Sequence, residues 1–124
     1  MGRLKEVLVV GALLAGCGGT EEAQVSYTEV AERTASVMCT YSERCGGSTV
    51  PYEECVAEVL AAYAAVEPEL NAAVAGAKSG CVQCMRIRTD ELEASLESDC
   101  QRPPDEARVR AVCGVEDAAC AGAP

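Results

Sequence analysis

The sequence predicts an all-α protein, a small disulfide-stapled array of four or five short helices. Apolar residues recur at the three- and four-residue spacing of helices in several stretches. No stretch alternates apolar and polar residues beside a turn pair such as Asn-Gly, so no strand is predicted. Nine cysteines stand in a chain of 124 residues, a length that allows a single domain.

Capping and breaking residues delimit the first two helices. Ser26 and Glu29 have the spacing of a capping box and place the start of the first helix at Ser26. A Gly-Gly pair at 46–47 ends this helix. Pro51 suits the first turn of the second helix, and the two glutamates that follow suit the positive end of the helix dipole. Pro68 is expected to break or kink the second helix.

Three further helices are expected in the second half of the chain. An alanine-rich helix is predicted over about 69–78, ended by Gly80, and the pattern over 81–88 leaves helix and loop open. Thr89 is expected to cap a helix that runs to residue 100, before a Pro-Pro pair. The last helix is predicted over about 105–113 and is closed by Gly114.

Residues 1–16 are predicted to be a signal peptide that is not part of the fold. Arg3 and Lys5 give a positive start, and the apolar run that follows, Val7–Leu14, is too short to span a bilayer as a helix. The run ends in Leu14-Ala15-Gly16-Cys17, which resembles the lipobox of bacterial lipoproteins. The alternative is a plain secretory signal followed by an incidental cysteine.

The lipobox resemblance implies a thioether-linked diacylglycerol on Cys17, cleavage before Cys17, and a membrane as partner through that lipid. Residues 17–25 would then be the acylated cysteine with a polar tether, and residues 26–124 a single cysteine-rich helical domain. Gly18, not Asp, follows the anchor, which by analogy with that family favours the outer membrane of the cell envelope over the inner one.

The eight cysteines other than Cys17 are predicted to form four disulfides, because an even number in an exported chain indicates a disulfide framework. They are Cys39, Cys45, Cys55, Cys81, Cys84, Cys100, Cys113 and Cys120. Such cross-links are expected because residues 17–124 hold only 19 Val, Leu, Ile and Met residues, which make a thin core. The layout resembles small eight-cysteine lipoproteins of myxobacteria and their relatives, a resemblance that implies no activity.

The connectivity is a hypothesis, since eight cysteines allow 105 pairings. We expect Cys45–Cys55 to link the first two helices across their turn and Cys113–Cys120 to close the C-terminal loop. Cys39 and Cys100 would then bond Cys81 and Cys84 in some order.

Cys81 and Cys84 form a CxxC motif, which has three interpretations. A thiol–disulfide redox site needs a depressed thiol pKa and normally a βαβ context, and a zinc site needs a second close cysteine pair. Neither context is evident, so we expect both cysteines to be structural and not bonded to each other. No metal site and no cofactor are predicted.

The remaining candidates for chemistry have simpler explanations. The acidic pairs are expected to be solvated surface, mostly in first helical turns; they lie at 53–54, 90–91, 105–106 and 116–117. The four tyrosines are expected to pack in the core or at its edge with wet hydroxyls; they are Tyr27, Tyr41, Tyr52 and Tyr63.

Charge and composition narrow the function. Twenty acidic residues stand against ten basic ones, a formal net charge of −10, which excludes a nucleic-acid binder. The chain has no histidine, so Ser-His-Asp and Cys-His nucleophile systems are excluded. We expect a non-enzymatic, lipid-anchored envelope protein that meets another protein, a glycan or a cell-wall component. The alternative is an envelope thiol–disulfide oxidoreductase that uses Cys81 and Cys84.

Overall fold

Four α-helices and one 3₁₀ helix make up the computed structural model, which describes residues 19–121 and 123. In chain order they are α2 (Gly19–Arg44), α3 (Tyr52–Ala72), α4 (Ala77–Glu97), α5 (Glu106–Cys113) and η1 (Val115–Cys120). The predicted class, a disulfide-stapled all-α array, is confirmed, and the described residues contain no strand. No helix among them has both the length and the apolar character that a bilayer span requires. The predicted signal peptide, Cys17 and Gly18 lie outside the described residues.

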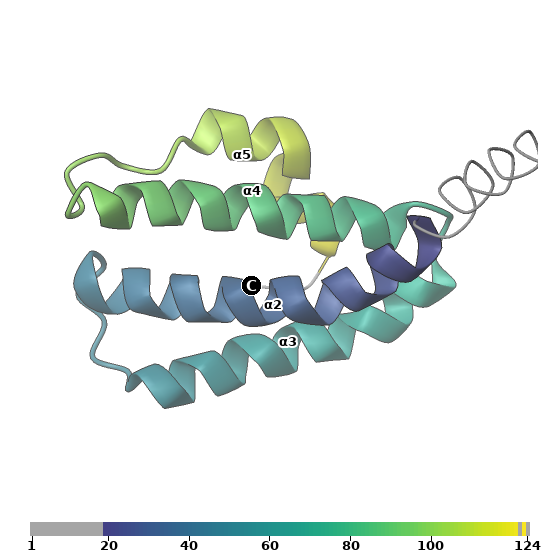
Figure 1. The fold of residues 1–124 in the computed structure, drawn as a ribbon, viewed down its shortest axis with the longest axis horizontal. Helices are drawn as coiled ribbons and strands as arrows, with labels where there is room; N and C mark the ends of the chain where they lie inside the picture. The colour runs from purple at the N-terminus through teal and green to yellow at the C-terminus, as the bar shows by residue number, and fades with distance from the viewer. Residues whose placement is uncertain (1–18, 122, 124) are drawn as a thin grey trace, which may run out of the picture.

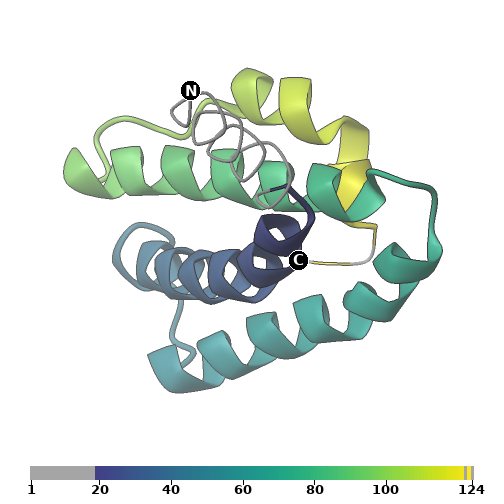
Figure 2. The same ribbon diagram turned by 45° about the vertical axis from the view of Figure 1, so that its right-hand side comes forward.

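In chain order, each α-helix runs opposite to the one before it, and in space the helices are stacked in the order α3, α2, α4, α5 (Figure 1). α2 packs between α3 and α4, α5 packs on the other side of α4, and η1 contacts both α4 and α5. α2 and α4 run parallel, because α3 carries the chain back to the end where α2 began (Figure 2). α3 makes few contacts with α4. The molecule therefore consists of two halves, α2–α3 and α4–α5–η1, joined along the contact between α2 and α4, which we call the α2–α4 seam.

A buried pair of hydroxyls lies in the middle of the seam. Thr34 Oγ1 and Thr89 Oγ1 are 2.9 Å apart, and both side chains are fully buried. Beside them the Arg33 guanidinium donates to Asp90 at 2.9 Å and to Glu93 at 2.6 Å. These ion pairs are half exposed and are worth about 0–1 kcal/mol each. The threonine pair matters more, because a buried hydroxyl without a partner is costly.

A tyrosine cluster closes the seam near the start of α2 and α4. The buried Tyr27 hydroxyl donates to the Tyr63 carbonyl at 2.6 Å. Lys78 Nζ lies 5.3 Å from the centre of the Tyr27 ring and 2.8 Å from a Glu67 carboxylate oxygen. Burial, with the nearby Glu67 and Tyr63, raises the pKa of Tyr27 to about 12. This cluster joins three helices, and it shows that Tyr27 and Tyr63 are core residues.

The first helix begins earlier than the sequence pattern predicts. α2 starts at Gly19, so Ser26 lies inside the helix and the predicted capping box is wrong. Residues 19–25, predicted as a tether, are helical in the structure. The segment contains Glu21, Glu22 and Ala23, which are good helix formers, and the two acids suit a first turn.

The boundary between the second and third predicted helices is also wrong. α3 continues through Pro68 to Ala72, and Val66 and Leu70 on either side of the proline are buried. The chain turns only at 73–76, where Gly76 has a φ of 94°, in the left-handed region that glycine favours. α4 then runs without a break past Gly80 and Thr89. Thr89 therefore caps no helix, and its hydroxyl is bonded across the seam to Thr34 instead.

The C-terminal helix follows the prediction closely. α5 covers Glu106–Cys113, its N-cap Asp105 accepts a hydrogen bond from the Arg108 backbone N–H at 3.1 Å, and Gly114 follows its last residue. The short helix η1, which was not predicted, comes directly after it.

The threonine pair generates a test of the seam. Thr89→Val leaves the buried Thr34 hydroxyl without its partner and should lower the free energy of unfolding by about 1–3 kcal/mol. The double variant Thr34→Val with Thr89→Val removes both polar groups at nearly constant shape, so it should be more stable than the single variant. Urea denaturation measures both. Thr40→Val is the matched control in the same helix, because its hydroxyl bonds only to the carbonyl of Ser36 within α2. A double variant less stable than Thr89→Val alone contradicts this account.

Candidate functional site

The structure pairs all eight predicted cysteines in four disulfides. The pairs are Cys39–Cys55, Cys45–Cys100, Cys81–Cys120 and Cys84–Cys113. The first joins α2 to α3, and the last two join α4 to η1 and α5. Only Cys45–Cys100 links the two halves of the molecule, at the far end of the seam from the tyrosine cluster.

The predicted pairings are wrong, and the way in which the helices pack explains why. Cys45 does not reach Cys55, because α2 runs on to Arg44 and carries Cys45 past the start of α3. The parallel course of α4 brings Cys100 to the same end, where Asp99 also lies 3.5 Å from Arg44. Cys39, further back in α2, then takes Cys55 in the first turns of α3.

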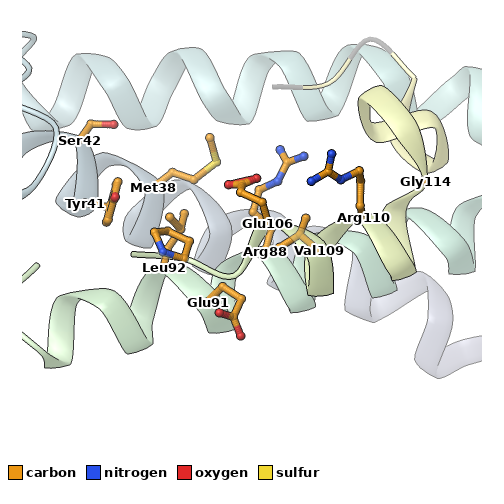
Figure 3. A pocket seen from close by; sticks show the side chains of 11 residues that line it. Met38, Tyr41, Ser42, Arg88, Glu91, Leu92, Glu106, Val109, Arg110 and Gly114 are labelled. Carbon is orange, nitrogen blue, oxygen red and sulfur yellow. The ribbon is translucent and has the colours of Figure 1, made fainter. Parts of the chain in front are cut away.

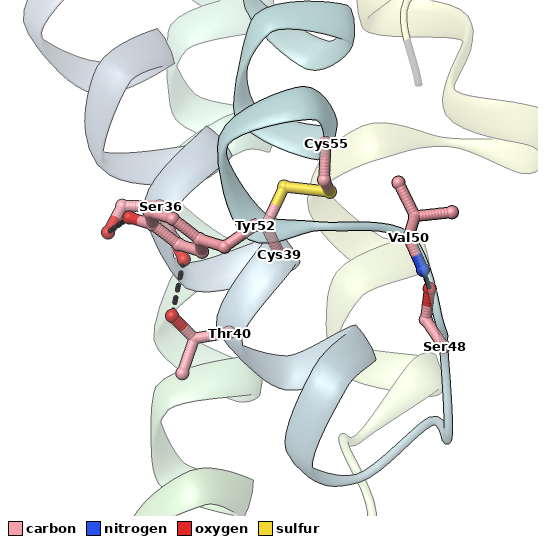
Figure 4. The surroundings of a disulfide bond; sticks show 7 residues. All are labelled: Ser36, Cys39, Thr40, Ser48, Val50, Tyr52 and Cys55. Carbon is pink, nitrogen blue, oxygen red and sulfur yellow. Dashed lines mark hydrogen bonds between the residues drawn. A yellow bond between two sulfur atoms is a disulfide. The ribbon is translucent and has the colours of Figure 1, made fainter.

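Cys39–Cys55 lies in a polar setting (Figure 4). Ser36 Oγ and the Tyr52 hydroxyl are 3.0 Å apart, and Thr40 Oγ1 donates to the Ser36 carbonyl at 2.8 Å. Tyr52 is 40% exposed, so it packs at the edge, as the sequence predicts. The disulfide and the hydrogen bond between Ser36 and Tyr52 together hold the first turn of α3 against α2.

The CxxC motif is built into the covalent frame. Cys81 and Cys84 lie one helical turn apart in α4, and both are buried. Cys81 reaches η1 and Cys84 reaches α5, as expected for two structural cysteines that are not bonded to each other. Cys113 and Cys120 therefore do not close on each other, contrary to the prediction. No group of three or more His, Cys, Asp or Glu side chains in the described residues could hold a metal ion.

The buried carboxylate of Glu91 binds the start of α5. The acidic pair at 90–91 was predicted to be solvated surface, and for Glu91 that prediction is wrong. Glu91 is 2% exposed. Its Oε1 accepts from the Asp105 backbone N–H at 2.9 Å, and its Oε2 accepts from Arg108 Nη1 at 2.8 Å. In a capping box a glutamate three residues after the N-cap would bind the N-cap N–H. Here that position is Arg108, and Glu91 of α4 supplies the carboxylate.

Sequence reasoning missed Glu91 because it broke α4 at Thr89. In an uninterrupted helix, Glu91 follows Cys84 by seven residues and precedes Ser95 by four, so all three lie on one face. That spacing was the available signal.

A pocket of about 600 Å³ lies beside this carboxylate, between the second half of α2, the middle of α4, and α5. Its apolar wall comes from Met38, Tyr41, Leu92 and Val109. Arg88, Glu106 and Arg110 extend into the same space (Figure 3). Glu91 contributes to the wall, with both of its oxygens already bonded within the protein.

The pocket has the chemistry of a binding site for a small acidic ligand. The Arg110 guanidinium can donate charge-assisted hydrogen bonds to a carboxylate or sulfonate. The apolar wall can cover the body of such a ligand. Arg88 and Arg110 are balanced in the lining by Glu91 and Glu106, so the pocket is less acidic than the chain as a whole, whose net charge is −10.

The disulfide network predicts an outcome of tryptic mapping without reduction. Cleavage after Lys78, Arg86 and Arg110 gives peptides 79–86 and 111–124, each with two cysteines. The Cys81–Cys120 and Cys84–Cys113 bonds should keep these two peptides joined until reductant is added. Recovery of the peptides as separate species, each with an internal disulfide and together with insulin-reducing activity, would favour a redox site.

The pocket predicts binding of an anionic aromatic dye, anilinonaphthalene sulfonate. Arg110→Glu should weaken binding about ten-fold or more, since a hydrogen bond to a charged group is worth about 1.5–3 kcal/mol. Arg102→Glu changes the net charge equally outside the pocket and is the matched control. Fluorescence titration measures both. Equal weakening by the two variants would show that only overall charge acts on the dye.

Comparison of this chain with protein-family models, with curated proteins and with solved structures finds no match. Its functional assignment therefore depends on three features of the chain itself. These are the motif that ends at Cys17, the four disulfides, and the pocket between α2, α4 and α5.

Proposed function

We propose that this chain is a cell-envelope protein anchored by a lipid on Cys17, with a non-enzymatic structural or binding role. The observation that carries the proposal is the agreement between the lipobox-like motif and the cysteine pairing. The eight other cysteines are all consumed by bonds among themselves, so none is left as a partner for Cys17. In an exported protein, one additional cysteine directly after a signal-like segment is suited to be the lipid attachment site.

The disulfides support export. Four structural disulfides form and persist in oxidising compartments such as the bacterial periplasm or the cell surface, and they are rare in the cytosol. The short signal-like segment points to the same compartment. Gly18 after the anchor supports the outer membrane as the destination.

The pocket supports a binding role. It offers the Arg110 guanidinium and an apolar wall, and an acidic group on an envelope protein, a glycan or a cell-wall component would suit it. Nucleic acid is a poor partner because of the net negative charge.

The alternative, a thiol–disulfide oxidoreductase that uses Cys81 and Cys84, has less support. A redox pair of this type exchanges electrons through a bond between its own two sulfurs, with at least one sulfur accessible to a partner. Here each cysteine is buried and bonded to a different helix.

The anchor is tested by expressing the full chain in a Gram-negative bacterium with radiolabelled or alkyne-labelled fatty acid. Cys17→Ala should lose the label and leave the membrane fraction. Its body should keep four disulfides, because Cys17 takes no part in them. Gly18→Asp is the matched control: it should keep the label and move the protein from the outer to the inner membrane. Retention of unlabelled Cys17→Ala on membranes after a high-salt wash would place the anchor elsewhere.

A further inference from the structure

The turn between α3 and α4, residues 73–76, presents an apolar surface to solvent. Val74 is 81% exposed, the highest value among the large hydrophobic residues of the described chain. Residues 71–76 are all exposed, and residues 70–77 contain no charge. Val115 is the next most exposed, at 71%, but Glu116 and Asp117 follow it directly. The turn is therefore a small uncharged patch on an otherwise acidic protein.

The turn lies at the end of the molecule where α2 begins (Figure 1). Lys78, the second residue of α4, is level with Tyr27, since its Nζ lies over the Tyr27 ring. From Tyr27 back to Gly19 the helix extends about 12 Å, at about 1.5 Å per residue. From Glu67, the ion-pair partner of Lys78, α3 extends forward about 7 Å to Ala72. The turn is thus level with the first turns of α2.

Only Gly18 separates Cys17 from the first residue of α2. Two residue steps span at most about 7 Å, even when fully extended. A lipid on Cys17 therefore holds the start of α2, and with it the turn, close to the membrane. The anchor also raises the effective concentration of the turn at that surface, so a patch too small to bind alone can stay in contact.

We propose that the 73–76 turn rests on the lipid surface when the protein is anchored, with Val74 among the lipid headgroups and upper acyl chains. This inference rests on the proposed lipid anchor at Cys17. It sets the orientation of the body: the long axis stands away from the membrane on two contacts, the anchor and the turn. The pocket, lined by Met38, Tyr41 and Ser42 of the second half of α2, then lies toward the end of the molecule that is farther from the bilayer. The net charge of −10 favours zwitterionic over anionic lipids.

The chain has no tryptophan, so a single introduced tryptophan reports its own surroundings. Val74→Trp places the reporter in the turn. Val50→Trp is the matched control, because Val50 is also an exposed valine, at 43%, and lies at the opposite end of α3, about 30 Å away. The lipidated full-length variants are reconstituted into phosphatidylcholine vesicles with or without bromine on the upper acyl chain. The vesicles are then floated and their fluorescence compared.

We expect brominated lipid to lower the Val74→Trp emission at least about two-fold and to leave Val50→Trp nearly unchanged, because quenching requires contact with the acyl region. Adding anionic lipid should reduce the quenching of Val74→Trp. Equal quenching at both positions would mean that the body lies flat, and it overturns the inference. A blue-shifted Val74→Trp emission that ignores bromine and grows with protein density would show a second copy on the turn, which also overturns it.

The anchor and the turn fail in different ways. If the lipidated protein is absent from the floated vesicles, both the proposed anchor and the inference about the turn are wrong. If the protein floats with the vesicles but Val74→Trp is not quenched, the proposed anchor stands and only the proposed contact between the turn and the lipid is wrong.

Discussion

The α2–α4 seam is the contact on which the rest of the structure depends. α3 packs mainly on α2, and α5 and η1 pack on α4. Each outer layer is therefore positioned by the inner helix on which it packs. One disulfide lies within α2–α3 and two lie within α4–α5–η1, whereas a single disulfide, Cys45–Cys100, joins the two halves. At one end of the seam Lys78 of α4 lies over the Tyr27 ring, in the middle Thr34 and Thr89 are hydrogen-bonded, and at the other end lies that disulfide. Because the apolar core is thin, the stability of the seam depends on these three specific contacts as well as on buried apolar area.

The sequence pattern predicted the class of the fold and the existence of its helices, because helical periodicity and Gly or Pro signals are local properties. It failed where a tertiary partner overrides a local signal. Thr89 has the character of an N-cap, but a hydroxyl from α2 satisfies it inside a helix. Pro68 has the character of a breaker, but burial of Val66 and Leu70 keeps the helix going. These two errors shortened the predicted helices. The predicted cysteine pairing failed because pairing depends on which helix ends meet in space, which a local pattern leaves open.

In the candidate site too, features set by local sequence were predicted and features set by tertiary contacts were not. That Cys81 and Cys84 serve different elements followed from their one-turn spacing, and the structure confirms it. The pocket could not be predicted, since its wall comes from three helices whose packing the sequence leaves open. Glu91 is the instructive case: its local context, an acidic pair after a threonine, indicates a solvated first turn. Only the continuity of α4 places it in the interior, where it replaces the glutamate that α5 lacks at its third position.

The four disulfides also enclose overlapping stretches of chain. The bond Cys39–Cys55 spans residues 39–55, Cys45–Cys100 spans 45–100, and Cys81–Cys120 spans 81–120. No peptide bond between residues 39 and 120 lies outside all three. One proteolytic cut in any connecting loop, including the exposed turn at 73–76, therefore releases no fragment, and the cut ends stay tethered beside the contacts they need to remain folded. With this arrangement, a single proteolytic cut that would otherwise release a fragment can leave the fold intact.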